Sequence, residues 1–166
     1  AEVCRLAGAL QALGVQRGDR VGLYMPNLPE TFIAFFAVLK IGAVVMPLFS
    51  GFGPQPLVAR LNDGEAKVVL TVDGTWRRGT PGAMKSVLDE ALQNTPSVEH
   101  VLVLRHLGEA LACPMTPGRD HDWAAAVARQ ASELPTTEMQ ADDAAVLLYT
   151  SGTTGKPKGC VWTHVS

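Results

Sequence analysis

Apolar segments with helical and extended periodicity alternate along this chain, and this alternation constrains the possible fold more than any other feature. Val3, Leu6, Leu10 and Leu13 recur at helical spacing, and a short apolar run follows soon after them. The predicted helices of the first half are 3–13, 30–41 and 57–64, and the predicted strands are 21–25, 43–48 and 67–72. Strands that are connected by helices pair in parallel. The chain is therefore predicted to be an α/β protein with a mostly parallel sheet and crossover helices.

The second half of the chain continues this pattern with longer connections. Helices are predicted at 84–92 and 123–131, and strands at 101–104, 145–149 and 160–163. The connections are a polar loop at 73–82, an irregular, exposed segment at 105–122 and an internal linker at 133–143. The helix at 30–41 is apolar on nearly every face, so we expect it to be packed on several sides. The strand at 145–149 is expected to be buried.

Composition and charge argue against several classes of function. The chain has 166 residues, enough for one domain, and its 16 acidic and 14 basic residues form no basic stripe that would bind nucleic acid. The longest apolar run, Phe32–Leu39, is too short to span a membrane, and no signal segment opens the sequence. Cys4, Cys113 and Cys160 have no metal-motif spacing and indicate buried, reduced thiols in the cytoplasm. The sequence does not indicate an oligomeric state.

One ten-residue segment has the composition of a polyphosphate-binding loop, and it directly follows the predicted strand at 145–149. Its glycines allow positive φ angles and a close approach of the backbone to a ligand, so successive N–H groups can form a nest for an anion. Its hydroxyl groups are further donors, and its lysines add positive charge. The candidate phosphate-binding residues are Thr150, Ser151, Gly152, Thr153, Thr154, Gly155, Lys156, Lys158 and Gly159. We call residues 150–159 the phosphate loop.

The phosphate loop differs from a P-loop of the Walker type. That motif continues from glycine and lysine to serine or threonine, whereas Gly155 and Lys156 are followed here by Pro157. Proline lacks the N–H group that a helix turn would use, which argues against a helix beginning there. A Walker-type NTPase is thus disfavoured. A glycine- and threonine-rich hairpin turn with solvated lysines is the alternative that gives this segment no ligand.

The string from Tyr149 to Gly159 resembles the signature loop of the adenylate-forming superfamily, which contains acyl-CoA synthetases, peptide-synthetase adenylation domains and luciferases. Further stretches resemble the first part of the same catalytic domain, namely 18–21, 29–30, 39–43 and Pro47. Those most similar to acetyl- and propionyl-CoA synthetases are 49–52, 60–63, 73–77, 89–92 and 96–101. The resemblance implies that residues 1–166 are part of an N-terminal AMP-binding domain that is cut at both ends.

The resemblance also implies a reaction. In this family a carboxylate attacks the α-phosphate of ATP to form an acyl-adenylate, and the thiol of CoA then displaces AMP. The implied ligands are ATP, Mg²⁺ and CoA, the implied substrate is a small carboxylic acid, and the implied protein is a cytoplasmic enzyme of fatty acid metabolism. The phosphate loop would hold the β- and γ-phosphates and the leaving pyrophosphate.

Arg77 matches a position where enzymes similar to acetyl-CoA synthetase place an arginine near the CoA nucleotide. The second basic residue of that pattern is replaced by Thr80 here, so a solvated loop arginine is the alternative. The catalytic lysine is expected beyond Ser166, and the chain alone is expected to form no acyl-adenylate. Two other functions stay open, an adenylation domain of the peptide-synthetase type and a nucleotide-binding module without turnover.

Overall fold

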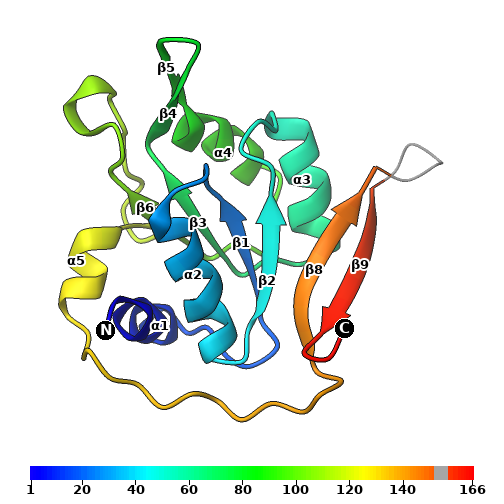
Figure 1. Cartoon of the computed structure of the whole chain (residues 1–166). Coiled ribbons are helices and arrows are strands. Elements are labelled where there is room, and N and C mark those ends of the chain that lie inside the picture. Colours follow the sequence, from blue (N-terminus) through cyan, green and yellow to red (C-terminus); the bar gives the residue numbers. More distant parts are fainter. Residues whose placement is uncertain (152–156) are drawn as a thin grey trace.

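The computed structural model describes residues 1–151 and 157–166, which form one seven-stranded sheet and a separate two-stranded hairpin (Figure 1). The sheet has the order β7-β6-β3-β1-β2-β8-β9. Its strands are β1 (Arg20–Tyr24), β2 (Val44–Leu48), β3 (Val68–Val72), β6 (His100–Leu104), β7 (Asp120–Asp122), β8 (Ala144–Thr150) and β9 (Lys158–Thr163). All neighbours are parallel except β8 and β9. The predicted α/β fold with a mostly parallel sheet is confirmed.

Helices cover both faces of this sheet (Figure 1). On one face α1 (Glu2–Ala12) packs against α2 (Pro29–Lys40) and α5 (Trp123–Ala128), and on the other α3 (Pro54–Asp63) packs against α4 (Met84–Leu92). A short 3-10 helix, η1 (Gly108–Ala110), follows β6. Among the described residues, no helix has both the length and the apolar character needed to cross a bilayer.

The direction in which strands are added reverses at β1. The chain places β2 on one side of β1 and β3 on the other, and later returns to the β2 side with β8. Tyr24 and Leu48 are paired at the last positions of β1 and β2, so both strands end at the same edge, and β8 runs parallel to them toward Thr150. Ligands of open parallel sheets bind outside the carboxyl ends of the strands near such a reversal. This edge, which we call the carboxyl edge, is where a site is expected.

Local sequence signals explain where α2 begins and ends. Pro29 occupies its first turn, where no N–H group is needed, and Glu30 lies near the positive end of the helix dipole. Lys40 is in the last turn, near the negative end. Gly42 then adopts a φ of 71°, and the N–H of Ala43 bonds back to the carbonyl of Val38. The chain thereby turns from α2 directly into β2.

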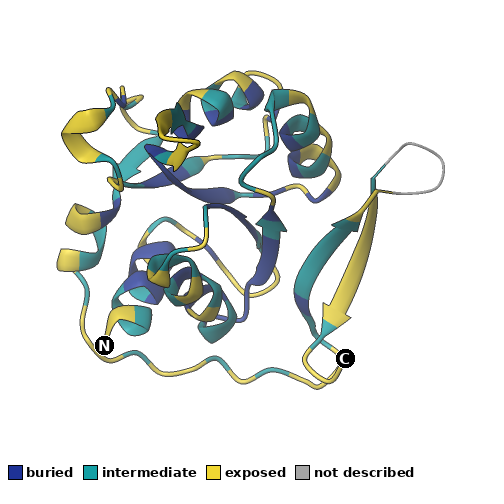
Figure 2. Ribbon diagram, turned by 45° about the horizontal axis from the view of Figure 1, so that its top comes forward, coloured by how far each residue is buried: buried dark blue, intermediate teal, exposed yellow. Residues whose placement is uncertain are grey.

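The core follows from the apolar strands in the middle of the sheet (Figure 2). All five residues of β3 are buried, as are four of the five in β1. A strand buried along its whole length is covered on both faces. The central strands are therefore a rigid support for the residues at the carboxyl edge.

The predicted polar loop at 73–82 is wrong in part, because it forms an antiparallel hairpin of β4 (Gly74–Arg77) and β5 (Thr80–Ala83). Its two turn residues, Arg78 and Gly79, have φ angles of 49° and 81°. Positive φ at both central positions is the geometry whose twist matches that of the paired strands. Arginine is an unusual residue for the first of these positions, so the sequence did not indicate a hairpin.

The predicted irregular, exposed character of 105–122 is also wrong in part. The segment contains η1, and its last residues form β7, which pairs with β6. Cys113 is buried, and the side chain of Asp120 has no exposed surface. Asp120 accepts contacts of 2.7 Å from Lys85 Nζ and 2.6 Å from Arg119 Nε, so a buried charge cluster anchors this end of the segment.

Two predictions about packing hold only in part. The helix α2 contacts α1, β1 and β2, so its predicted packing on several sides is confirmed, but its outer face is open, with Phe32 and Phe36 exposed by 65% and 57%. In β8 only Ala145 is buried, and the residues from Val146 to Tyr149 are half-buried. The strand shares a single register pair with β2, and its other neighbour, β9, is exposed at all but its last residue (Figure 2).

The three cysteines differ in exposure. Cys113 is buried, Cys4 is half-buried and Cys160 is exposed on β9, and all three are free thiols. The prediction of buried thiols is therefore confirmed for Cys113 and wrong for Cys160, whose strand lies at the sheet edge.

Candidate functional site

The predicted phosphate loop connects β8 to β9 at the carboxyl edge. Thr150, the last residue of β8, lies opposite Lys158, the first residue of β9, and both are exposed, as is Ser151. Gly159 pairs with Tyr149 one step further into the hairpin. Among the predicted phosphate ligands, Gly152, Thr153, Thr154, Gly155 and Lys156 lie outside the described residues. The structure thus brings the two ends of the loop together, with Lys158 facing solvent beside Thr150.

Gly159 packs closely against two side chains of β8. A Cβ atom at this position would lie 3.1 Å from Leu147 Cδ1 and 3.4 Å from the ring of Tyr149. The first distance is shorter than an ordinary van der Waals contact, so Leu147 would have to shift slightly, whereas the ring of Tyr149 would be in ordinary contact. Pro157 precedes β9 and not a helix, as its missing N–H group predicted.

Tyr149 connects the start of the phosphate loop to α3. Its hydroxyl donates a hydrogen bond of 2.7 Å to Asp63 Oδ2. Burial and the neighbouring Asp63 carboxylate raise the pKa of Tyr149 well above its ordinary value, so the phenol keeps its proton and acts as the donor. The guanidinium of Arg60, also on α3, lies 5.8 Å from the centre of the Tyr149 ring. The strand that enters the loop is therefore attached to α3 by two side-chain contacts.

Arg77 lies at a second place on the carboxyl edge. It is exposed on β4 and lines a cavity of about 280 Å³ together with Tyr24, Phe52 and the loop that follows β2. An added Cβ on Gly51 would overlap the Phe49 ring and lie 3.0 Å from Arg77 Nη2, so the missing side chain leaves room for both. The Tyr24 hydroxyl donates to the carbonyl oxygen of Phe52 at 2.8 Å and holds that loop in place. We call this cavity the Arg77 cavity.

Thr80 occupies the position where the pattern of acetyl-CoA-synthetase-like enzymes has a second basic residue. It lies directly opposite Arg77 in the hairpin, and its hydroxyl donates to the Arg77 carbonyl oxygen at 2.9 Å. A basic residue at that position would lie next to Arg77, whereas Thr80 adds only a hydroxyl. Within the described part of the chain, no hydrogen bond or ion pair joins Arg77 to Thr150, Ser151, Lys158 or Gly159. The phosphate-loop ends and Arg77 are thus two separate groups on one edge.

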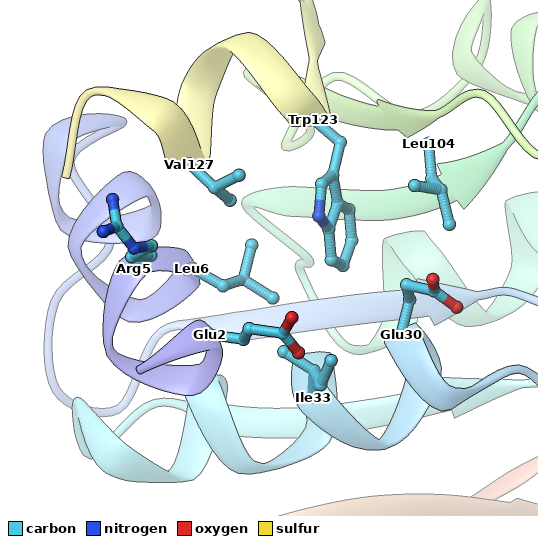
Figure 3. Close-up of a pocket in the computed structure, with 8 residues that line it drawn as sticks. All are labelled: Glu2, Arg5, Leu6, Glu30, Ile33, Leu104, Trp123 and Val127. Atoms are coloured by element: carbon cyan, nitrogen blue, oxygen red, sulfur yellow. The ribbon is translucent and has the colours of Figure 1, made fainter. Parts of the chain in front are cut away.

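Other cavities lie on the side of the sheet that α2 covers, and two of them concern the carboxyl edge or its surroundings. The larger, of about 610 Å³, is apolar and is lined at the ends of β1 and β2 by Phe32, Phe36, Phe49 and Pro47, among others. The smaller, of about 180 Å³, lies between α1, α2 and α5, where the indole of Trp123 points toward α2 near Glu2 and Glu30 (Figure 3). This smaller cavity contains no residue of the phosphate loop.

The described residues favour binding over proton-transfer chemistry at the carboxyl edge. No group of three or more His, Cys, Asp or Glu side chains among them has the geometry to hold a metal ion. Charge neutralisation by Lys158 and Arg77 and donation by Thr150 and Ser151 suit a ligand that carries phosphate groups. Positioning and electrostatic stabilisation are the contributions that phosphate chemistry requires of a protein.

Sequence reasoning did not identify two contributors to this edge. Arg60 and Tyr149 were noted only as parts of longer strings, and their contact with each other depends on the packing of β8 against α3. The aromatic residue directly before the phosphate loop was the available signal. Its partner could not be identified, because the two residues are far apart in the chain.

The sequence of this chain is similar to those of known proteins. A family model described as AMP-binding enzyme matches residues 1–166. The acetyl-coenzyme A synthetase of Methanothrix thermoacetophila is 48% identical over 162 residues, which are 98% of this chain and 24% of that protein. Those of Streptomyces coelicolor and Novosphingobium aromaticivorans are 46% and 44% identical, with 98% of this chain and 25% of each relative covered. The chain spans about a quarter of the length of these relatives.

Proposed function

This chain belongs to the AMP-binding enzyme family, and from that premise we propose that its full-length protein is an AMP-forming acid–thiol ligase. The protein would activate a small carboxylic acid with ATP and transfer the acyl group to CoA. The similarity to acetyl-coenzyme A synthetases over 98% of the chain supports this proposal. The observation that carries it is the phosphate loop, whose ends, Thr150 and Lys158, meet at the carboxyl edge of the sheet.

The proposed reaction has two balanced steps. A carboxylate oxygen of the acid bonds to the α-phosphorus of ATP, and the bond from that phosphorus to the bridging oxygen breaks, which releases pyrophosphate. The CoA thiol then attacks the acyl carbonyl, loses its proton to solvent, and AMP leaves with its phosphate. Thr150, Ser151, Lys158 and Gly159 would bind the β- and γ-phosphates and stabilise the leaving pyrophosphate. We include Gly152, Thr153, Thr154, Gly155 and Lys156 in this binding set from their sequence.

Mg²⁺ is proposed as the partner of the nucleotide phosphates. Magnesium prefers oxygen ligands and is commonly bound through substrate phosphates and one or two carboxylates. The phosphates of the nucleotide would supply oxygen ligands for the ion. When bound, the ion would neutralise phosphate charge, and the residues named above would orient the triphosphate beside it.

Arg77 is proposed to bind a phosphate of CoA. Its guanidinium is exposed at the mouth of the Arg77 cavity, beside a glycine that leaves space for it. We expect Arg77→Ala to raise the KM for CoA about three- to tenfold and to leave pyrophosphate exchange without CoA unchanged, because exposed ion pairs with phosphate are weakened by water. Arg78→Ala, at the adjacent turn, is the matched control. Equal effects of the two substitutions would instead indicate a solvated loop arginine.

The direct test is acid-dependent exchange of pyrophosphate into ATP, followed by acyl-CoA formation, with a panel of short acids and the full-length protein. We expect exchange with at least one acid and AMP as the second product. The same assay on residues 1–166 alone should give no exchange, because the catalytic lysine is proposed to lie in the rest of the protein. Clear exchange by the 166-residue chain would refute that part of the proposal.

Two alternatives make different predictions. A peptide-synthetase adenylation domain would exchange pyrophosphate with an amino acid and would ignore CoA as acceptor. A nucleotide-binding module would bind ATP in a calorimetric titration and show no exchange with any acid.

We place residues 1–166 in an N-terminal AMP-binding domain, with 133–143 as an internal linker. The free thiols support a reducing, cytoplasmic compartment, and a role in fatty acid metabolism is part of the proposal.

A further inference from the structure

Arg60 lies between two aromatic rings on the α3 side of the sheet. Its guanidinium carbon is 4.3 Å from the centre of the Phe52 ring and 5.8 Å from the centre of the Tyr149 ring. Both distances are within the range of about 6 Å in which a guanidinium is attracted by the face of an aromatic ring. Arg60 Nη1 also donates to the carbonyl oxygen of Pro56 at 3.0 Å, which fixes the direction of the side chain. Arg60 is half-buried, so this arrangement is partly shielded from water.

The two rings belong to different parts of the carboxyl edge. Tyr149 is the residue before Thr150, and its hydroxyl is held by Asp63 at 2.7 Å. Phe52 lines the Arg77 cavity, and its carbonyl oxygen is held by the Tyr24 hydroxyl at 2.8 Å. Tyr149 is thus held through its side chain and Phe52 through its backbone, and Arg60 contacts the rings of both.

We propose that Arg60 is a positioning residue that holds the strand end entering the phosphate loop and the wall of the Arg77 cavity in one fixed relative arrangement. This inference rests on the proposed function, in which the phosphate loop binds the ATP phosphates and the Arg77 cavity binds CoA. Arg60 touches neither ligand in this proposal. It acts through the Tyr149 ring on one side and through the Phe52 ring on the other.

A simpler role for Arg60 explains less of the geometry. Arg60 lies in the last turn of α3, where a positive charge stabilises the helix dipole. That role would be served by any exposed lysine or arginine and needs no aromatic neighbour. It accounts for the charge but leaves the contacts with both rings unexplained, and it predicts an effect on stability alone.

The expected effect follows from the two ring contacts. A cation–ring contact at a partly exposed site corresponds to about a two- to fivefold change in an equilibrium constant. Arg60→Met keeps a long apolar side chain and removes both contacts. The dissociation constants of ATP and of CoA should therefore each rise about two- to fivefold. Arg60→Lys, which keeps the charge without the planar group, should give a smaller rise in both.

The experiment uses the full-length protein and measures ATP and CoA binding separately by isothermal titration calorimetry, with Tm recorded for each variant. Val58→Ala, at a half-buried position on the same helix, is the control, because it removes apolar packing and keeps the guanidinium of Arg60. It should lower Tm and leave both dissociation constants unchanged. In a Phe52→Leu background, Arg60→Met should no longer raise the CoA dissociation constant, because the ring that transmits the effect is gone.

The proposal is overturned if Arg60→Met lowers Tm but changes neither dissociation constant, or if it changes that of one ligand alone. Binding is measured without turnover, so the outcome is separate from the proposed reaction. Absence of acyl-CoA formation by the unmodified protein would remove the proposed function. Unchanged dissociation constants of ATP and CoA in Arg60→Met would refute only the positioning role of Arg60.

Discussion

Replacing Asp120 by asparagine should destabilise the fold by about 3 kcal/mol. The side chains of Asp120 and Lys85 are 0% and 2% exposed, and Lys85 Nζ lies 2.7 Å from Asp120 Oδ2. Breaking a buried ion pair by removing one partner costs about 3–5 kcal/mol, because the other charge is left buried. Lys85 keeps Asp89 at 2.8 Å, and the asparagine carbonyl can still accept one bond, so the lower end of that range applies.

Equilibrium urea unfolding, followed by circular dichroism, measures this loss. At about 2–4 °C per kcal/mol for a chain of this size, the accompanying fall in Tm is about 6–12 °C. Asp142→Asn, at an exposed position, should change the free energy of unfolding by less than about 0.5 kcal/mol. A loss below about 1 kcal/mol for Asp120→Asn would refute the reasoning, since the cluster would then contribute no more than a surface pair.

The pH dependence of stability supplies a second readout for Asp120. Burial alone would raise its pKa, but the hydrogen bonds from Arg119, Lys85 and the N–H of Thr116 together lower it below the ordinary value. A carboxyl group with a lowered folded-state pKa stabilises fully above its unfolded pKa, and this contribution is lost as pH falls through the folded pKa. The free energy of unfolding of Asp120→Asn should therefore fall less steeply than that of the unmodified chain below about pH 4. Parallel curves for the two proteins would contradict this assignment.

Three further substitutions test other parts of the fold by the same unfolding measurement. Asp73→Asn should lower the free energy of unfolding by about 3 kcal/mol. The buried carboxylate accepts hydrogen bonds from the N–H groups of Gly74 and of residues 106–108, and an amide nitrogen would face one of these donors. A loss under about 1 kcal/mol would show that the amide is accommodated. Gly64→Ala should lower the free energy of unfolding by about 1–3 kcal/mol, because the new Cβ would lie 2.7 Å from Met46 Sδ. An unchanged midpoint of urea unfolding would contradict this close packing. Phe36→Ser should change stability by less than about 0.5 kcal/mol, and a larger loss would show that this ring is buried.

The parallel sheet could be predicted from the sequence because its signals are local. The predicted strand at 67–72 is a nearly continuous apolar run, and Pro29 and Gly42 mark the limits of α2. The pattern of apolar residues cannot show how much of a helix its neighbours will cover. For this reason α2 was expected to be packed on several sides, and the exposure of Phe32 and Phe36 on its outer face could not be predicted.

The candidate site was predictable in composition but not in its contacts. Thr150 and Lys158 were predicted from the composition of the phosphate loop, and they pair across β8 and β9. The contact between Arg60 and Tyr149 and the ion pair between Lys85 and Asp120 join residues distant in sequence. Such pairs are set by how the elements pack, and a charged side chain read from sequence alone is assumed to be solvated. The buried charge cluster was missed for that reason.

The fate of one oxygen atom tests the proposed reaction most directly. The full-length protein would be incubated with ATP, CoA and a short carboxylic acid labelled with ¹⁸O in its carboxylate, and the products would be analysed by mass spectrometry. If a carboxylate oxygen attacks the α-phosphorus and AMP then leaves, one ¹⁸O atom must appear in AMP and none in pyrophosphate. Label in inorganic phosphate together with ADP, or unlabelled AMP alongside acyl-CoA, would contradict an acyl-adenylate intermediate.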